Sequence, residues 1–289
     1  RRMLSTLLPR SPRRHLRSSA PSGSTAGNIR VRLSYEQPTA TLSVTRGTTV
    51  NGSPANRFRV DLSQQGDDCV ATEYGQLLGR GVVRVTPGNG LTELTTWKRS
   101  ANRYRGVLEC RIVDGQLTLI NDLPLDTYLY GLAEEPDSQP YEKQRAFAVA
   151  ARSYAAHYTQ EEYRKFPGKP YDGDDSPARF QKYSGVDFEE RHPRWVEAVK
   201  STAGLVLKKN GQIVKTPYFS SDDGRTRSPA ERGWGNFLFA EIFSSKPDPW
   251  CEGMDLRGHG VGMSGCGSKG QAEEGKTGEQ ILEYYYPGT

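Results

Sequence analysis

An Asp-Gly pair at positions 114–115 restricts the fold more than any other feature of this chain. Apolar and polar residues alternate on both sides of it, over 103–113 and 116–120. Because Asp-Gly tolerates the positive φ angles that a two-residue loop requires, we predict a β-hairpin here. Shorter alternating runs, separated by Gly, Pro and Asn, predict further strands upstream. They cover 31–35, 40–44, 58–62 and 82–85.

The pattern changes after residue 121. Pro140 fits the first turn of a helix with Ser138 as its N-cap, and the stretch from 141 to about 165 is rich in Ala and poor in β-branched residues. We predict one long helix there. Its buried stripe is expected to contain the apolar residues at helical spacing, which are Phe147, Ala151, Tyr154 and Tyr158.

Three local signals predict the remaining elements. Residues 193–200 favour a helix, an Asn-Gly pair at 210–211 favours a second hairpin, and Thr277 with Gln280 has the spacing of a capping box before a last helix to about residue 285. The fold class is therefore predicted as α+β. The domain organisation is predicted as a disordered basic tail over 1–29, a β-rich region over 30–122 and a mixed α+β domain over 123–289.

Charge and hydrophobicity exclude some functions. The formal net charge is +5, but six of the 39 basic residues are arginines in residues 1–20, which leaves 33 basic against 34 acidic residues. A near-neutral folded part argues against a nucleic-acid partner. No run approaches the ~20 apolar residues of a membrane span, so no transmembrane segment is predicted.

The chain has four cysteines, at positions 69, 110, 251 and 266, and none forms a Cys-x-x-Cys pair. This spacing argues against a zinc ribbon and against a redox motif. Two disulfides, 69–110 and 251–266, would form in an exported protein, and free buried thiols would be expected otherwise.

Four motifs occur in a fixed order in the C-terminal half. They span 123–131, 140–154, 218–224 and 258–264, and a Tyr-rich segment at 281–288 follows them. Together they resemble the stage II sporulation protein D family, whose founding members are lytic transglycosylases of peptidoglycan. The resemblance covers residues 123–288 and leaves residues 30–100 unassigned.

The family places its catalytic glutamate in a Glu-Met-Pro context before the Ala-rich helix. Here the corresponding residues are Glu134, Glu135 and Pro136. Counting back from Pro136 identifies Glu134, with Glu135, which replaces the family's Met, as the alternative. The interval from Gly131 is also shorter than usual in the family, so the resemblance separates the two carboxylates poorly.

A glutamate in this role must deliver a proton to the leaving oxygen, which requires a raised pKa. In a lytic transglycosylase the C6 hydroxyl of the muramic sugar attacks, so one carboxyl acts first as acid and then as base. The paired carboxylates of ordinary glycosidases are not required. The alternative reading is that both acids are solvated residues near a helix N-terminus.

Three further polar residues are candidates. Arg152 needs a carboxylate or a bound anion as partner, and the resemblance suggests that it faces the cleft; the alternative is an internal ion pair. Gln181 and Tyr183 are similar to a Gln-x-Tyr segment of the family and are predicted to line the sugar groove, with a surface loop as the alternative.

The two Gly-rich motifs supply the remaining predicted cleft residues, which are Ser220, Ser221, Asp222, His259 and Ser264. Ser264 lies in a near match to a nucleophile elbow, but Cys266 replaces its last glycine, so a Ser–His hydrolase is a distant alternative. A metal site of His259 with Cys251, Asp255 and Cys266 lacks the short ligand spacing of zinc sites. We therefore predict no metal and no cofactor.

The resemblance implies a lytic transglycosylase that cleaves the β-1,4 bond between N-acetylmuramic acid and N-acetylglucosamine and leaves a 1,6-anhydro end. Its partners would be peptidoglycan strands and other cell-wall hydrolases. It would be extracytoplasmic and wall-associated, either secreted or anchored by a further segment. The alternative is a non-catalytic wall-binding protein that enhances a cell-wall amidase.

Overall fold

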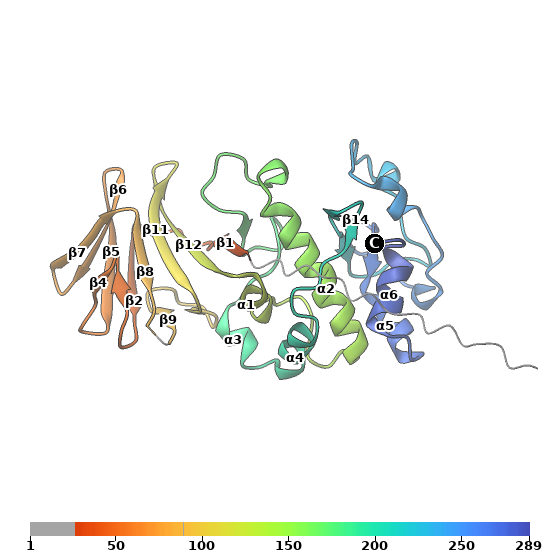
Figure 1. The fold of residues 1–289 in the computed structure, drawn as a ribbon, viewed down its shortest axis with the longest axis horizontal. Helices are drawn as coiled ribbons and strands as arrows, with labels where there is room; N and C mark the ends of the chain where they lie inside the picture. The colour runs from red at the N-terminus through yellow and green to blue at the C-terminus, as the bar shows by residue number, and fades with distance from the viewer. Residues whose placement is uncertain (1–26, 89) are drawn as a thin grey trace, which may run out of the picture.

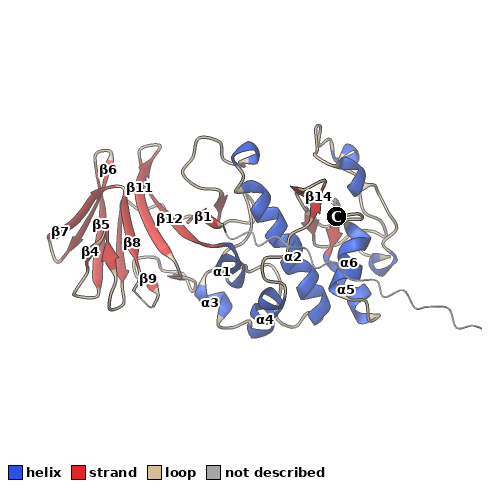
Figure 2. Ribbon diagram, in the orientation of Figure 1, coloured by secondary structure: helices blue, strands red, loops and turns tan. Residues whose placement is uncertain are grey.

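The computed structural model describes residues 27–88 and 90–289. A β-sandwich occupies one end of an elongated molecule, the long helix α2 lies in the middle, and the C-terminal helices lie at the other end (Figure 1). Within the described residues, no helix has the length and apolar character needed to cross a membrane. The predicted α+β class, with its β-rich N-terminal half, is confirmed (Figure 2).

The strands of the sandwich are β1 (Asn28–Arg32), β2 (Thr39–Ser43), β3 (Thr49–Val50), β4 (Ser53–Pro54), β5 (Arg59–Gln65), β6 (Asp68–Glu73), β7 (Gln76–Gly81), β8 (Val83–Thr86), β9 (Thr92–Leu94), β10 (Arg103–Tyr104), β11 (Val107–Val113), β12 (Gln116–Pro124) and β13 (Gly173–Asp174). They form one sheet in the order β13-β1-β12-β11-β8-β3-β4 and another in the order β10-β9-β2-β5-β6-β7. Within these sheets only the β1–β13 pairing is parallel.

The predicted hairpin forms between β11 and β12. Val113 pairs with Gln116, and the loop residues Asp114 and Gly115 have φ angles of 52° and 76°. The alternation of β11 turns Leu108 and Cys110 into the core. Cys110 forms a disulfide with Cys69 of β6, with 6.0 Å between their Cα atoms, so this bond joins the two sheets of the sandwich.

The remaining elements are α1 (Leu125–Tyr130), α2 (Tyr141–Tyr158), α3 (Val186–Glu189), α4 (Pro193–Ser201), α5 (Gly265–Glu273), α6 (Gly278–Tyr285), the short 3-10 helices η1 (Glu161–Tyr163), η2 (Ala230–Arg232), η3 (Ala240–Phe243) and η4 (Pro249–Cys251), and the short strands β14 (Lys208–Lys209), β15 (Gln212–Ile213), β16 (Tyr218–Phe219) and β17 (Met263–Ser264). α4, the β14–β15 hairpin at Asn210-Gly211 and the Thr277 capping box of α6 confirm the three local predictions.

The long helix α2 differs from its prediction at both ends. It ends at Tyr158 rather than near residue 165, because the chain turns through Thr159 into η1. At the other end Pro140 takes the N-cap position and no side chain caps the helix, so the prediction of Ser138 as N-cap was wrong. The predicted stripe is buried except for the half-buried Tyr154. Helices α1, α4, α5 and α6 all contact α2.

Of the two predicted domain boundaries, the one near residue 29 differs from the structure. Asn28 and Ile29 already belong to β1, so the predicted tail is too long at its C-terminal end, and residues 1–26 lie outside the described part. The division at 122/123 stays a prediction. β13, which follows α2 in the chain, pairs with β1 and so joins the sheet of the N-terminal region.

Candidate active site

A cleft of about 660 Å³ lies at the N-terminal end of α2. Its lining includes the segment 134–136, Lys143 and Phe147 of α2, the segment 218–221 and Met263. Trp250 of η4, Met254 and the α5 residues Cys266, Lys269 and Glu273 complete this part of the lining. The two predicted glutamates and the Ser-rich motif thus meet in one cleft.

Close backbone packing fixes the segment that carries Glu134. A Cβ atom on Gly131 would lie 2.8 Å from the backbone of Gly185, so only glycine allows this approach. Leu132 then forms an antiparallel bridge with Tyr183, and the amide of Ala133 donates to the carbonyl of Lys182 at 2.8 Å. This pairing brings the chain at 181–183 beside Glu134.

Two donors hold the Glu134 carboxylate. The backbone amide of Lys182 donates to Oε1 at 2.9 Å, and the Tyr218 hydroxyl donates to Oε2 at 2.5 Å. Burial raises the pKa of Glu134 above its ordinary value, and the hydrogen bonds from Tyr218 and Lys182 oppose that rise only in part. The side chain still lines the cleft and is partly exposed. Its carboxyl can therefore carry a proton at a higher pH than a solvated glutamate.

Gln181 lies behind this carboxyl and is buried. Its Nε2 donates to the Tyr218 hydroxyl at 2.8 Å and to the Ala151 carbonyl at 3.3 Å, and its Oε1 accepts from the Tyr128 hydroxyl at 3.1 Å. The amide occupies the acceptor side of the Tyr218 oxygen, so the tyrosine proton points to Glu134. Gln181 thus orients Tyr218 and does not line the cleft.

Glu135 has a different environment. It is 4% exposed, and its Oε1 lies 3.0 Å from the ammonium of Lys143. Burial raises the pKa of Glu135 above its ordinary value, and the charge of Lys143 opposes that rise only in part. The two adjacent carboxyls therefore differ in partner: Glu135 faces a cation, whereas Glu134 faces only neutral donors.

Ser220, Ser221 and Asp222 differ in exposure and in contacts. Ser220 is exposed and Ser221 is buried, and both line the cleft; the Ser221 hydroxyl donates to the Asp255 carbonyl at 2.7 Å. Asp222 is fully buried and its Oδ1 accepts from the Gly224 amide at 3.0 Å. Burial and then the nearby Asp248 raise the pKa of Asp222 to about 6.

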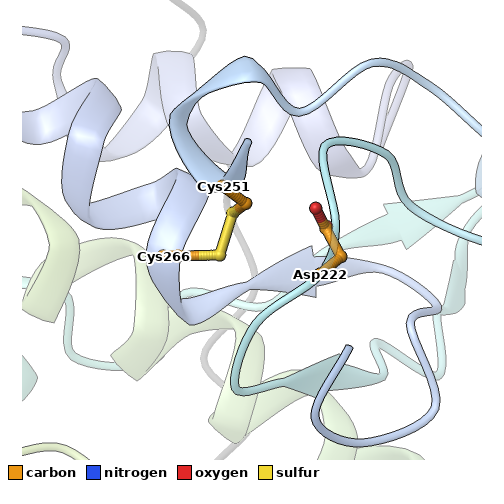
Figure 3. Close-up of side chains that lie close together, drawn as sticks. All are labelled: Asp222, Cys251 and Cys266. Atoms are coloured by element: carbon orange, nitrogen blue, oxygen red, sulfur yellow. A yellow bond between two sulfur atoms is a disulfide. The ribbon is translucent and has the colours of Figure 1, made fainter. Parts of the chain in front are cut away.

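Asp222 lies beside the second disulfide, as Figure 3 shows. Cys251 and Cys266 are bonded to each other, with Cα atoms 5.6 Å apart, and this bond ties η4 to the first turn of α5. One carboxylate oxygen of Asp222 and the two sulfurs lie within 4.8 Å of one another. In this oxidised form the sulfurs offer no thiolate, so the donor set does not suit a metal ion.

Ser264 and His259 have structural contacts. Ser264 is fully buried, its hydroxyl donates to Asp248 at 2.5 Å, and it caps α5 by accepting the Gly267 amide at 2.9 Å. His259 packs edge-on against Trp234, and burial lowers its pKa to about 4. The two side chains do not lie on the cleft wall, and no serine–histidine hydrogen bond forms in the described part of the chain.

Arg152 and Tyr183 also lie away from the cleft. The Arg152 guanidinium is 0% exposed; it donates to Asp126 at 2.6 Å and to the carbonyls of Val199 and Leu205 at 3.1 and 3.2 Å. This is the internal ion pair that the sequence offered as the alternative, because a buried guanidinium needs partners for all its donors. The Tyr183 hydroxyl donates to Asn121 and its ring packs on Tyr128 in the core.

Sequence reasoning missed Tyr218, Lys143 and Trp250 as site residues. Tyr218 begins one of the recognised motifs, so its position was visible, but its hydrogen bond to a residue 84 positions away was not. Lys143 and Trp250 carried no local signal.

Comparison with known proteins agrees with the motifs. The model of the family described as "Stage II sporulation protein" matches residues 113–208. Stage II sporulation protein D of Bacillus subtilis (strain 168) is 23% identical over 259 residues, which covers 59% of this chain and 75% of that protein. The predicted resemblance to the stage II sporulation protein D family is confirmed. This family is linked to peptidoglycan processing, so the comparisons support a cell-wall-related function of the sporulation-protein type.

Proposed function

We propose that this protein is a peptidoglycan lytic transglycosylase with Glu134 as its general acid and base. The observation that carries the proposal is the Glu134 carboxyl itself. It lines a large cleft, its pKa is raised by burial, and two neutral donors fix its orientation. Proton delivery by a positioned carboxyl requires this combination.

The reaction would proceed in two proton transfers. Protonated Glu134 gives its proton to the glycosidic oxygen as the bond to C1 of the muramic sugar breaks. The resulting carboxylate then removes the proton of the C6 hydroxyl as that oxygen bonds to C1. The products are a free 4-hydroxyl end and a 1,6-anhydro end, no water is consumed, and Glu134 returns to its protonated form.

The contacts of the site support separate roles for its residues. The Tyr218 hydroxyl stabilises the carboxylate that exists between the two proton transfers, and Gln181 holds that hydroxyl in place. Glu135 pairs with Lys143, whereas the Glu134 carboxyl contacts two neutral donors, so Glu134 is the better placed of the two to exchange a proton with a substrate. Phe147 and Trp250 on the cleft walls offer apolar faces to sugar rings.

The proposed substrate places the protein outside the cytoplasm, in contact with the wall and with other wall hydrolases. The rival function, wall binding that enhances a separate amidase, would use the same cleft without cleavage. Ser220, at the cleft surface, would serve glycan binding in either case.

The test is mass spectrometry of soluble products after incubation with glycan strands, both intact and stripped of stem peptides. Glu134→Gln should abolish anhydromuramyl products. Glu162→Gln, which removes an exposed glutamate on η1, is the matched control and should retain them. Product release by Glu134→Gln at the wild-type rate would refute the assignment. Wall binding without products from any variant would favour the amidase enhancer.

A further inference from the structure

A cluster of cations lies on the outer face of the first sheet of the sandwich, around a concave surface of about 500 Å³. Three arginines come from neighbouring strands, Arg30 of β1, Arg84 of β8 and Arg111 of β11. Arg164 and Lys169 reach the same surface from the loop that follows α2. We call these five residues the basic basin.

Strand register explains why the three arginines converge. Arg30 lies directly opposite Asp122 on β12, and Arg84 lies directly opposite Glu109 on β11. Glu109 and Arg111 are two residues apart on one strand, so they share a face of the sheet. Arg30 and Arg84 each contact both carboxylates, at distances of 2.6–3.1 Å, and Arg111 contacts Glu109 at 2.7 Å.

The carboxylates lie beneath the cations. The side chains of Glu109 and Asp122 are 2% and 10% exposed, whereas those of Arg30, Arg84 and Arg111 are 26%, 41% and 30% exposed. Three partly exposed guanidiniums thus share two buried acids.

The two loop cations have their own partners. Arg164 pairs with the buried Asp172 at 3.2 Å and with the exposed Glu161 at 3.6 Å, and Lys169 pairs with the exposed Asp114 at 2.5 Å. The exposed partners lie at the rim and can rotate away, since surface ion pairs of this kind contribute little to stability. The cations are thus more exposed than three of their five carboxylate partners, which are Glu109, Asp122 and Asp172.

The basin is separate from the cleft. The cleft residues Lys143 and Phe147 belong to the first two turns of α2, while the basin loop follows its last residue, Tyr158. At 1.5 Å per residue these ends are roughly 20 Å apart.

We propose that the basic basin binds the phosphate groups of a phosphodiester polyanion, such as a poly(glycerol phosphate) of the cell wall. Guanidiniums suit phosphate oxygens, and those of Arg30 and Arg84 are held in place by buried carboxylates while they remain partly exposed. The cations extend across four neighbouring strands, about 14 Å at 4.8 Å per strand spacing, which suits several successive phosphates of one chain. Fixed arginines in a concave surface favour this ligand over a membrane, which is usually met by mobile lysines on a flat face.

The experiment is calorimetric titration of the protein with short synthetic poly(glycerol phosphate), at low and high salt. The test variant is Arg111→Gln with Lys169→Gln, which leaves Glu109 paired with Arg30 and Arg84 and leaves only an exposed carboxylate without its partner. The matched control is Arg59→Gln with Arg80→Gln, which removes the same charge from exposed ion pairs on the other sheet.

We expect the test variant to bind about tenfold more weakly or worse, since each lost charge-assisted bond costs about 1.5 kcal/mol or more. The control should bind like the wild type, and thermal unfolding must show that both fold. Lys169→Gln alone provides the same test if the double variant does not fold. Equal binding by test and control variants, or binding to phosphatidylglycerol vesicles but not to the polymer, would overturn the proposal. Glu134→Gln leaves the basic basin intact, so this variant should still bind the polymer. Polymer binding can therefore be tested separately from the proposed catalytic activity.

Discussion

Buried carboxylates in the sandwich and in the cleft have different partners, and for Asp122 and Glu134 the difference decides the direction of the pKa shift. In the sandwich, burial raises the pKa of Asp122, but hydrogen bonds from Arg84 and Asn28 outweigh it, so the net pKa is below the ordinary value. In the cleft, burial prevails and the pKa of Glu134 rises, because its two hydrogen bonds come from neutral donors and the charge of Lys182 opposes the rise only in part. The pKa values of these two acids thus move in opposite directions, because arginine donors reach Asp122 and only neutral donors reach Glu134.

The adjacent residues Glu134 and Glu135 also differ in partner, although burial raises the pKa of both. Lys143 reaches Glu135 from the first turns of α2, whereas Glu134 points to Tyr218 and the Lys182 amide. Four substitutions test this account, and the largest expected effect comes from the most deeply buried cation.

Arg152→Met should lower the free energy of unfolding by about 3–5 kcal/mol, because it removes a fully buried guanidinium and leaves Asp126 and two carbonyls without their donor. Urea unfolding measures the loss. Arg145→Met on the same helix breaks more exposed ion pairs with Glu142 and Glu279, and should cost less than about 1 kcal/mol. Equal losses would contradict the distinction between buried and exposed pairs.

Tyr218→Phe should raise the pKa of Glu134 further, because the tyrosine hydroxyl donates to the carboxylate and so stabilises its ionised form. A general acid works below its pKa, so the alkaline limb of the pH–rate profile should move to higher pH while the maximal rate falls by about tenfold. Carboxyl NMR of Glu134 measures the pKa independently of activity. An unchanged or lowered pKa would show that the hydroxyl does not control this group.

Arg84→Met should destabilise the sandwich by about 1–2 kcal/mol at neutral pH, because Arg30 still pairs with both carboxylates. Because folding lowers the pKa of Asp122, its ionised form stabilises the folded state at any pH above its unfolded-state pKa. That stabilisation is lost as the pH falls through its folded-state pKa. The difference in thermal midpoint between wild type and variant should therefore shrink on acidification below about pH 4. Arg80→Met, in an exposed pair with Asp68, is the control. A difference in thermal midpoint between wild type and variant that stays constant with pH would argue against this linkage.

Asp222→Asn should act chiefly on the slope of stability with pH. Since burial and Asp248 raise the pKa of Asp222 from 3.8 to about 6, the folded state binds a proton more tightly than the unfolded state. Its stabilising contribution is complete below about pH 4 and is lost as the pH rises to about 6. Over this pH range, the thermal midpoint should fall less steeply with rising pH in the variant than in the wild type. The same slope in both proteins would exclude Asp222 as its source.

Much of the fold could be predicted because its signals are local. Asp114-Gly115 and Asn210-Gly211 adopt positive φ angles at the tips of their hairpins, and Thr277 caps α6 as its spacing indicated. The C-terminal end of α2 could not be predicted, because composition alone does not reveal where the chain turns to bring residues 170–175 against β1.

The candidate site divides in the same way. The family motifs located Glu134 and the segment at 218–221, which do meet in one cleft. They did not show that Gln181 orients Tyr218 instead of lining the cleft. They also did not show that Arg152 forms an internal ion pair.

The sequence by itself therefore determined the hairpins, the capped helix and the order of the motifs, since each depends on the backbone preferences of a few adjacent residues. Only the tertiary structure decided which partners each buried carboxylate has and where cations gather. Glu134 depends on donors 48 and 84 positions away, and the basic basin joins strands whose contacting residues are 25 to 92 positions apart. Electrostatic effects of this kind fall off with distance in space and with exposure to solvent, and neither quantity can be read along a chain.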